Sequence, residues 1–382
     1  MPSASTSGGI CEILVEFNSL RLSGLNTPGL VLFAICGTIN VALVCFDLFQ
    51  TIIVPRATLR RVRIAPYLIG RVLWPAYRAL VRRLPESWQT PWYEAFAPLV
   101  FVVLLGVWLS LLILGFAFLM IAFGQHIQPP ITQLSDALYF AGTSVLTLGF
   151  GDVVASQWPA RAVVLAAAMI GLIFMALEVS LLFSMQSYLQ QREQIVNTLT
   201  SRAGMPPSGL VLLLRYRELN IVPSLSTTFV QWESWVASIL ESHRAYPLLT
   251  YFRSSSSQNS WLAAIGATLD AAALLLTAID GDWVGEADLY YWMAVSTLKS
   301  ICANLPLAPV EGDTLTYSQF LQGLDLLKDI NYHVKDNEQS FRDFLVRRSA
   351  YVRYLVPLST CFELPLNVWL PDLKVNSLLP TK

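Results

Sequence analysis

Charged residues are scarce in this sequence. Asp, Glu, Lys and Arg make up 13% of its 382 residues, whereas they make up about 25% of an average soluble domain. Most of these charged residues lie in residues 189–382. We therefore expect the first part of the chain to be mostly embedded in a membrane and the second part to be closer to a soluble domain. The net charge of −1 argues against a nucleic-acid partner.

The sequence also lacks several motifs that would indicate a disulfide framework, a nucleotide-binding domain or an enzyme. The five cysteines include no CxxC pair, so we interpret them as reduced packing residues. No GxGxxG motif occurs, which gives no support to a nucleotide-binding regulatory domain. No arrangement of a nucleophile and a base can be recognised either. We expect a protein that is not an enzyme and has no cofactor, and the sequence names no regulatory ligand.

Three apolar runs are long enough to cross a bilayer, which takes about 20 residues. They cover residues 29–54, 96–123 and 160–186. The first run contains Asp47 and the third contains Glu178. Both carboxylates should face protein or water, because a charge is costly in lipid. For Asp47 we expect hydrogen bonds within the packed protein.

Basic residues are unevenly distributed between these runs. Residues 124–159 contain no Lys or Arg. In contrast, residues 55–95 contain eight arginines, which are Arg56, Arg60, Arg61, Arg63, Arg71, Arg78, Arg82 and Arg83. The positive-inside rule places this connection in the cytoplasm. It follows that residues 1–28 are expected outside the cytoplasm and residues 187–382 inside it.

The arginine-rich connection does not fit a voltage sensor, because Pro55, Pro66, Pro75 and Pro85 interrupt it. One apolar stripe runs along it instead, formed by Ile69, Val72, Leu73, Ala76, Leu80 and Leu84. We predict a helix that lies on the inner membrane surface. Arg71, Arg78 and Arg82 lie away from the stripe and are expected to touch anionic lipid.

A loop with the sequence TLGFGD, Thr147 to Asp152, lies between the second and third runs. The preceding residues 131–146 are predicted to form a short helix that ends inside the protein. Irregular backbone at membrane depth survives only where it lines a water-filled path. This segment resembles the pore of the potassium-channel family, in which filter carbonyls replace the hydration shell of the ion. The resemblance covers residues 96–186, as outer helix, pore helix, filter and inner helix.

Residue types in the filter fit this chemistry. Carbonyls that all point at one axis need left-handed backbone at alternate positions, which Gly149 and Gly151 adopt without steric cost. By resemblance, K⁺ is held at Thr147, Leu148, Gly149 and Phe150, with the side chains of Leu148 and Phe150 directed away from the axis.

Two positions depart from the family pattern. Phe150 stands where the family usually has Tyr, so the hydroxyl that commonly bonds to an aromatic on the pore helix is missing. Thr143 stands where several bacterial members have a Glu that pairs with the filter Asp. The behaviour of Asp152 therefore cannot be carried over from those members.

The third run contains the residues expected to line the inner cavity. Gly171 matches the place of a hinge in the family's inner helix, although it could equally serve close helix packing. Leu172, Met175, Val179 and Phe183 share one helical face, which by resemblance lines the cavity and inner gate. Glu178 has two interpretations, as a cavity carboxylate that attracts cations or as a packed residue bonded to a neighbouring helix.

Apolar spacing predicts seven helices in residues 187–382. They are Gln190–Ser201, Ser208–Leu219, Ser226–His243, Ser260–Ile279, Ala287–Ala303, Tyr317–Ile330 and Glu338–Leu355. Residues 261–279 are apolar enough for a fourth span, but Asp270 and the surrounding soluble-like sequence favour a buried helix.

Together these features predict an all-α membrane protein. We expect a homotetrameric potassium channel of a bacterial plasma membrane, with an extra first helix and a helical cytoplasmic domain. One filter copy per chain requires four chains around the axis. A weakly selective cation channel of the same architecture is one alternative, and a membrane sensor or scaffold that does not conduct is the other.

Overall fold

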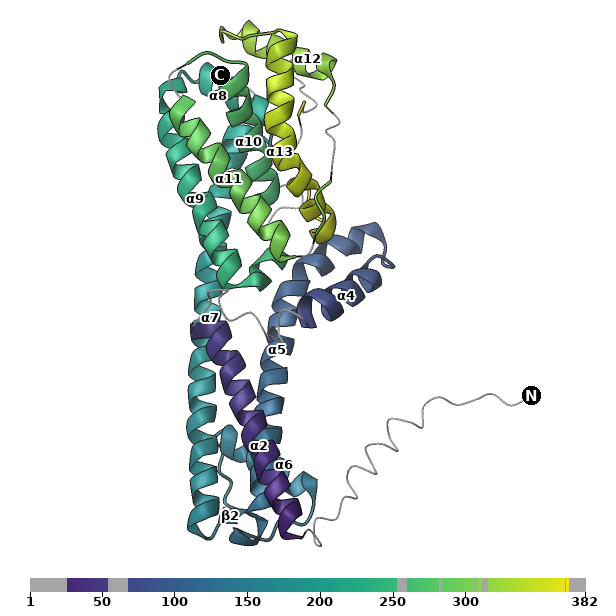
Figure 1. Cartoon of the computed structure of the whole chain (residues 1–382), viewed down its shortest axis with the longest axis vertical. Coiled ribbons are helices and arrows are strands. Elements are labelled where there is room, and N and C mark those ends of the chain that lie inside the picture. Colours follow the sequence, from purple (N-terminus) through teal and green to yellow (C-terminus); the bar gives the residue numbers. More distant parts are fainter. Residues whose placement is uncertain are drawn as a thin grey trace, which may run out of the picture. The chain divides into compact units, whose positions relative to one another are not determined.

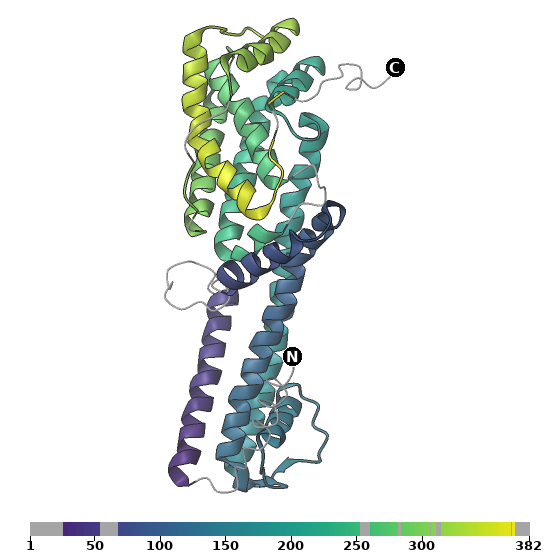
Figure 2. The same ribbon diagram turned by 90° about the vertical axis from the view of Figure 1, so that its right-hand side faces the viewer.

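The computed structural model describes residues 26–53, 68–252, 260–281, 284–305, 307–310, 315–367 and 369–370. The chain divides into two compact units, shown in two orientations in Figures 1 and 2. The first unit takes in residues 1–65 and 99–184, and the second takes in residues 66–98 and 185–382. The described part of the arginine-rich connection therefore belongs to the same unit as the C-terminal half. Most of the expected N-terminal segment 1–28 lies outside the described residues.

In the part of the chain that the structure describes, four helices build the first unit or enter it. They are α2 (Thr27–Leu48), α5 (Glu86–Ala122), α6 (Leu134–Val145) and α7 (Trp158–Ala203), and a π-helical turn, Phe49–Ile53, extends α2. Three of these helices, α2, α5 and α7, are long and apolar enough to cross a membrane. The predicted all-α membrane fold is thereby confirmed.

Two of these helices are longer than their apolar runs. α5 begins at Glu86, ten residues before the run at 96–123, and contains Pro91 and Pro98. α7 continues to Ala203 and absorbs the separate helix expected at Gln190–Ser201. Apolar composition marks only the part of a helix that lies in lipid, so a polar extension of the same helix is not seen by it.

Close approach of α2 and α5 depends on two glycines. A Cβ at Gly37 would lie 2.7 Å from the carbonyl oxygen of Gly115, and one at Gly115 would lie 2.8 Å from Cγ2 of Val41. Small residues let helix backbones approach in this way in membranes, where lipid provides no hydrophobic drive for association. Figure 1 shows the two helices side by side.

A small sheet frames the loop between α6 and α7. β1 (Ile127–Gln128) pairs antiparallel with β2 (Val154–Ala155), and a short 3₁₀ turn, Gly124–His126, precedes β1. The backbone N–H and the hydroxyl of Ser156 each donate to the carbonyl of His126 at 2.8 Å. These bonds join the segment that precedes α6 to the segment that precedes α7.

Among the described residues, seven helices lie entirely in the second unit. They are α4 (Trp74–Val81), α8 (Gly209–Glu218), α9 (Leu225–Ala245), α10 (Trp261–Thr277), α11 (Val284–Asn304), α12 (Tyr317–Asp329) and α13 (Glu338–Phe362). A π-helical segment, Leu68–Leu73, precedes α4, and 3₁₀ turns occur at Val222–Ser224 and Pro247–Tyr251. Figure 2 shows α13, in yellow, across the face of this bundle.

α10 is the centre of the second unit. All of its residues from Trp261 to Leu275 are buried, and α8, α11 and α13 pack around it. A Cβ at Gly209 of α8 would lie 2.6 Å from the carbonyl oxygen of Ala267, which shows how closely these two helices approach. The buried-helix interpretation of this segment is confirmed, because its neighbours are helices of its own chain.

Candidate functional site

The loop Thr147–Asp152 has an alternating backbone. Thr147, Gly149 and Gly151 have φ angles of +56°, +56° and +83°, whereas Leu148 and Phe150 between them do not enter the positive range. Alternation of this kind turns successive carbonyls toward one side of the chain, as an ion-coordinating ladder requires. A Cβ at Gly149 or Gly151 would meet no atom within 4 Å. The positive φ therefore favours glycine here, and lack of space does not.

α6 ends directly before this loop. Its last residue is Val145, and its C-terminal carbonyls carry the partial negative charge of the helix, which attracts a cation. The N–H of Leu148 donates to the carbonyl of Thr143 at 2.8 Å, so the first turn of the loop is tied to the helix. At the other end, the Asp136 carboxylate accepts from the N–H of Gln133 at 3.2 Å and satisfies a donor of the helix start.

Tyr139 of α6 connects the helix to the far end of the loop. Its hydroxyl donates to Oδ2 of Asp152 at 2.8 Å. Its ring stacks on Phe150, with centroids 6.5 Å apart and an angle of 6° between the planes. Thr143 instead turns its hydroxyl to the carbonyl of Phe140, 3.1 Å away. The sequence showed that position 150 lacks the Tyr hydroxyl and that Thr143 replaces a Glu, but it did not identify Tyr139, the aromatic of α6 that contacts both Phe150 and Asp152.

Gly171 lies where α7 meets the end of α6. A Cβ at this position would lie 1.9 Å from the carbonyl oxygen of Val145, a distance that no real contact reaches. This glycine is needed for the two backbones to touch next to the loop Thr147–Asp152. The observation favours the packing interpretation of Gly171, and the hinge stays a prediction.

The predicted cavity residues divide into two sets on α7. Leu172, Met175, Val179 and Phe183 are all more than half exposed in the single chain. Glu178 is only 6% exposed. It shares the buried face of α7 with Phe174, four residues before it, and Leu181, three residues after it. The structure therefore separates Glu178 from the other four residues and favours its packed position, while the bond to a neighbouring helix stays a prediction.

Asp47 is held by a partner on the neighbouring helix. Nε1 of Trp108 on α5 donates to its Oδ2 at 2.9 Å, and both side chains are buried. A charged group inside a membrane domain is expected to have such a partner. The expected hydrogen-bonded packing of Asp47 is confirmed.

The region that contains these elements has a known counterpart. Residues 101–187 match the family model described as an ion channel. The match covers most of the predicted pore, and with the three apolar helices it supports an all-α membrane protein that transports ions and is not an enzyme. No curated protein and no solved structure matches the chain.

Outside the ion channel domain, α4 is clasped to the end of α13 within the second unit. Arg78 and Arg82 both pair with Oε1 of Glu363, at 2.5 and 2.7 Å. Burial raises the pKa of Glu363, but the hydrogen bonds from the two guanidinium groups outweigh it and hold this pKa below its usual value. Nε1 of Trp74 donates to the carbonyl of Cys361 at 3.1 Å.

This clasp changes how the arginine-rich connection is understood. Arg78 and Arg82 have a carboxylate partner in their own chain, which sequence analysis did not foresee, and the side chain of Arg71 lies outside the described part. Trp74 is buried against Phe96 and Phe362. Val72 and Leu80 of the apolar stripe are exposed, so contact of this face with lipid stays a prediction.

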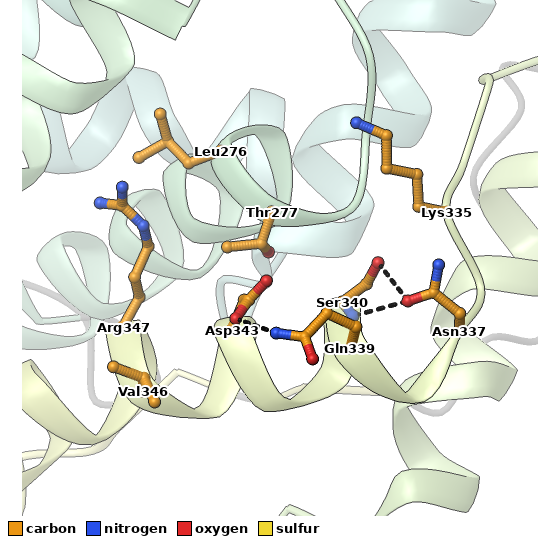
Figure 3. A pocket seen from close by; sticks show the side chains of 9 residues that line it. All are labelled: Leu276, Thr277, Lys335, Asn337, Gln339, Ser340, Asp343, Val346 and Arg347. Carbon is orange, nitrogen blue, oxygen red and sulfur yellow. Dashed lines mark hydrogen bonds between the residues drawn. The ribbon is translucent and has the colours of Figure 1, made fainter.

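One pocket of the second unit, with a volume of about 570 Å³, lies between the end of α10 and the start of α13 (Figure 3). Its lining consists of Leu276, Thr277, Lys335, Asn337, Gln339, Ser340, Asp343, Val346 and Arg347. Both cations are already paired, Lys335 with Asp280 at 2.5 Å and Arg347 with Asp288 at 3.0 Å. We therefore assign no ligand to it. Among the described residues, no group of three or more His, Cys, Asp or Glu side chains is placed to hold a metal ion.

Proposed function

We propose that the protein is a homotetrameric, potassium-selective channel whose filter is formed by residues Thr147–Asp152. The alternation of positive φ at Thr147, Gly149 and Gly151, directly after the end of α6, carries this proposal. A filter of this kind is a ring of several identical loops. The sequence contains one such loop, so four chains are needed to close the ring.

The surface of the single chain supports assembly around an axis. Leu148 and Phe150 are 55% and 67% exposed at the filter, and the inner-helix face at Leu172, Met175 and Phe183 is exposed as well. Large apolar side chains beside a polar loop are stable only if other protein or lipid covers them. In the proposed tetramer, neighbouring chains cover Leu148 and Phe150, and the inner-helix face borders the cavity.

Location and topology follow from the same proposal. The channel is placed in a bacterial plasma membrane, with the N-terminus outside and the C-terminal half in the cytoplasm. The uneven distribution of arginines supports this orientation. A cysteine introduced at the exposed Gln128 should react with a membrane-impermeant reagent in intact cells, and one at the exposed Gln231 should not. The reverse pattern would overturn the orientation.

Ion flux into proteoliposomes tests the function. The purified chain should pass K⁺ in preference to Na⁺ down equal gradients. Equal flux of both ions would establish the weakly selective alternative, and an absence of flux under all conditions would leave the sensor or scaffold alternative.

Two glycine variants link the flux to the filter. Gly149→Ala places a Cβ on a residue with φ of +56° and should abolish K⁺ flux while the assembly stays intact. Gly106→Ala is the matched control, because Gly106 lies in α5, has no positive φ, and has no atom within 4 Å of an added Cβ. Unchanged flux in Gly149→Ala would refute the filter assignment.

A further inference from the structure

The end of α7 has one face fixed to the second unit. Arg192, Val196, Leu199 and Ala203 are buried on this face. The guanidinium of Arg192 donates to the carbonyls of Leu249 at 3.2 Å and Phe252 at 2.9 Å. A helix of 46 residues is about 69 Å long, while the hydrocarbon core of a bilayer is about 30 Å thick. The last part of α7 therefore lies beyond the hydrocarbon.

The opposite face of this part is exposed and carries no charge. Its central positions are Ser187, Gln190, Gln194, Asn197 and Ser201, which we call the amide seam. Gln186, Gln191 and Thr198 flank the seam and are exposed and uncharged too. The solvent face of a helix outside a membrane usually carries charged residues. A face with only amides and hydroxyls over four turns calls for another explanation.

The spacing of the amide seam explains why this face has no charge. Its steps are three, four, three and four residues, the spacing at which helices coil around one another. Phe183, on the predicted cavity face, precedes Ser187 by one further step of four. Copies of one chain around an axis set identical residues opposite each other, so a charge on this face would repel its copies. The seam avoids that repulsion.

We propose that the amide seam faces the same seam of the other copies of this chain around the channel axis and lines a hydrated passage for the permeating ion. This inference rests on the proposed function. Apolar residues at these positions would close such a bundle into a dry coiled coil. Amide and hydroxyl oxygens instead accept hydrogen bonds from water and solvate a cation.

Cysteine cross-linking tests the contact between copies. Gln194→Cys, in the full chain in membranes, should form disulfide-linked dimers on mild oxidation. Gln231→Cys is the matched control, since Gln231 is an exposed glutamine of a helix in the same unit, and the unchanged chain controls for native cysteines. Gln190→Cys repeats the test one step along the seam. If neither seam variant cross-links more than the Gln231→Cys control, the inference is overturned.

Charge placed in the seam tests the passage. Gln194→Lys puts one positive charge per copy beside the ion and should lower the unitary K⁺ current about twofold or more. Gln231→Lys should leave that current unchanged. Cross-linking at the seam together with an unaltered current in Gln194→Lys would refute the passage. If the unchanged chain never conducts, the proposed function fails, and cross-linking still decides whether the seams meet.

Discussion

Two buried carboxylates show how differently the two units of this molecule hold charge. Asp270, at the centre of the second unit, is fully buried and accepts hydrogen bonds from Arg348, Tyr351 and Asn367. Glu178, on the part of α7 that lies in the first unit, is 6% exposed, and neither of its oxygens has a hydrogen-bond partner among the described residues. Asp270 is thus satisfied by its own chain, whereas Glu178 is not, and Glu178 differs in this from Asp47 of its own unit, which Trp108 bonds.

Apolar helices of the two units also differ in how far their own chain covers them. Leu32, Ile35 and Ile39 of α2 are more than half exposed, while every residue of α10 from Trp261 to Leu275 is buried. The apolar helix α10 is thus covered by its own chain, whereas the apolar helix α2 is left largely uncovered. Lipid and further copies of the chain are the partners that the proposed channel offers to the first unit.

The largest effect is expected from Asp270→Ala. Removal of this carboxylate takes away the acceptor of the Arg348 guanidinium, 3.0 Å away, in a buried site. Breaking a buried ion pair from one side costs about 3–5 kcal/mol. The free energy of unfolding of the second unit should fall by about this amount, measured by thermal unfolding of the detergent-solubilised chain.

An exposed pair provides the control for this change. Asp280 pairs with Lys335, and both side chains are more than half exposed. Pairs of this kind contribute about 0–1 kcal/mol, because water and salt screen them. Asp280→Ala should therefore leave unfolding almost unchanged. An equal loss in both variants would contradict the view that Asp270 is the buried centre of the unit.

Acid should destabilise the second unit through His243. Nδ1 of this buried side chain donates to the carbonyl of Ile239 at 2.8 Å, which leaves Nε2 to take up a second proton. Burial first, and then the charge of Arg192, lower the pKa of His243 to about 3. The stability that this neutral ring contributes is complete above pH ~6.5, its unfolded pKa, and is lost as the pH falls toward 3.

A pH series measures this loss. By pH 4.5 the free energy of unfolding should be lower by about 2–3 kcal/mol than at pH 7 through His243 alone. His243→Leu has no ring to protonate and should show a correspondingly smaller decrease over the same interval, from a lower starting value. Parallel pH profiles of the two proteins would remove His243 as the cause.

Sequence patterns predicted the helices of the second unit well. α8, α9, α10 and α12 begin and end within two residues of their predicted bounds, since apolar spacing and polar caps mark both ends. α13 runs seven residues past its predicted end and through Pro357. A proline normally argues against a continuing helix, but Leu358 and Phe362 are buried beyond it, and tertiary packing outweighs the local preference.

The candidate site was predictable in its backbone but less so in its side-chain contacts. Glycines two residues apart indicated the alternating φ angles, because few other residues adopt them. The contacts of Tyr139 with Phe150 and Asp152 join residues that lie eleven and thirteen positions apart, across the end of α6 and an irregular loop, and no periodicity indicates such contacts. Likewise the pairing of Arg78 with Glu363 joins residues 285 positions apart, so composition alone suggested lipid as the partner.

An intermediate effect is expected at the clasp between α4 and α13. Glu363→Gln removes the charge that Arg78 and Arg82 share and keeps the size of the side chain. Because these groups are partly exposed, the loss in free energy of unfolding should be about 0.5–1 kcal/mol. The depressed pKa of Glu363 means that its contribution is present above the usual pKa of a glutamate and fades as the pH falls through the lower folded value.

Thermal unfolding near neutral pH and again in acid measures this contribution. The difference between Glu363→Gln and the unchanged chain should shrink in acid, where the carboxylate is protonated. A difference that does not depend on pH would show that the pairing itself is not what the variant removes.

The smallest effect on stability is expected at Glu178, where Gln keeps the length of the side chain and removes only the charge. Because Glu178 lies on the buried face of α7 with Phe174 and Leu181, and not with Met175 and Val179, we expect the unitary K⁺ current and block by internal Mg²⁺ to stay unchanged in Glu178→Gln. Its carboxylate acts within the packed helices, so the variant should alter open probability instead. Single-channel recording in planar bilayers, with Mg²⁺ titrated on the cytoplasmic side, separates the two. A lower current together with weaker Mg²⁺ block would return Glu178 to the ion path, since a carboxylate acts on permeating cations through space only where it faces them.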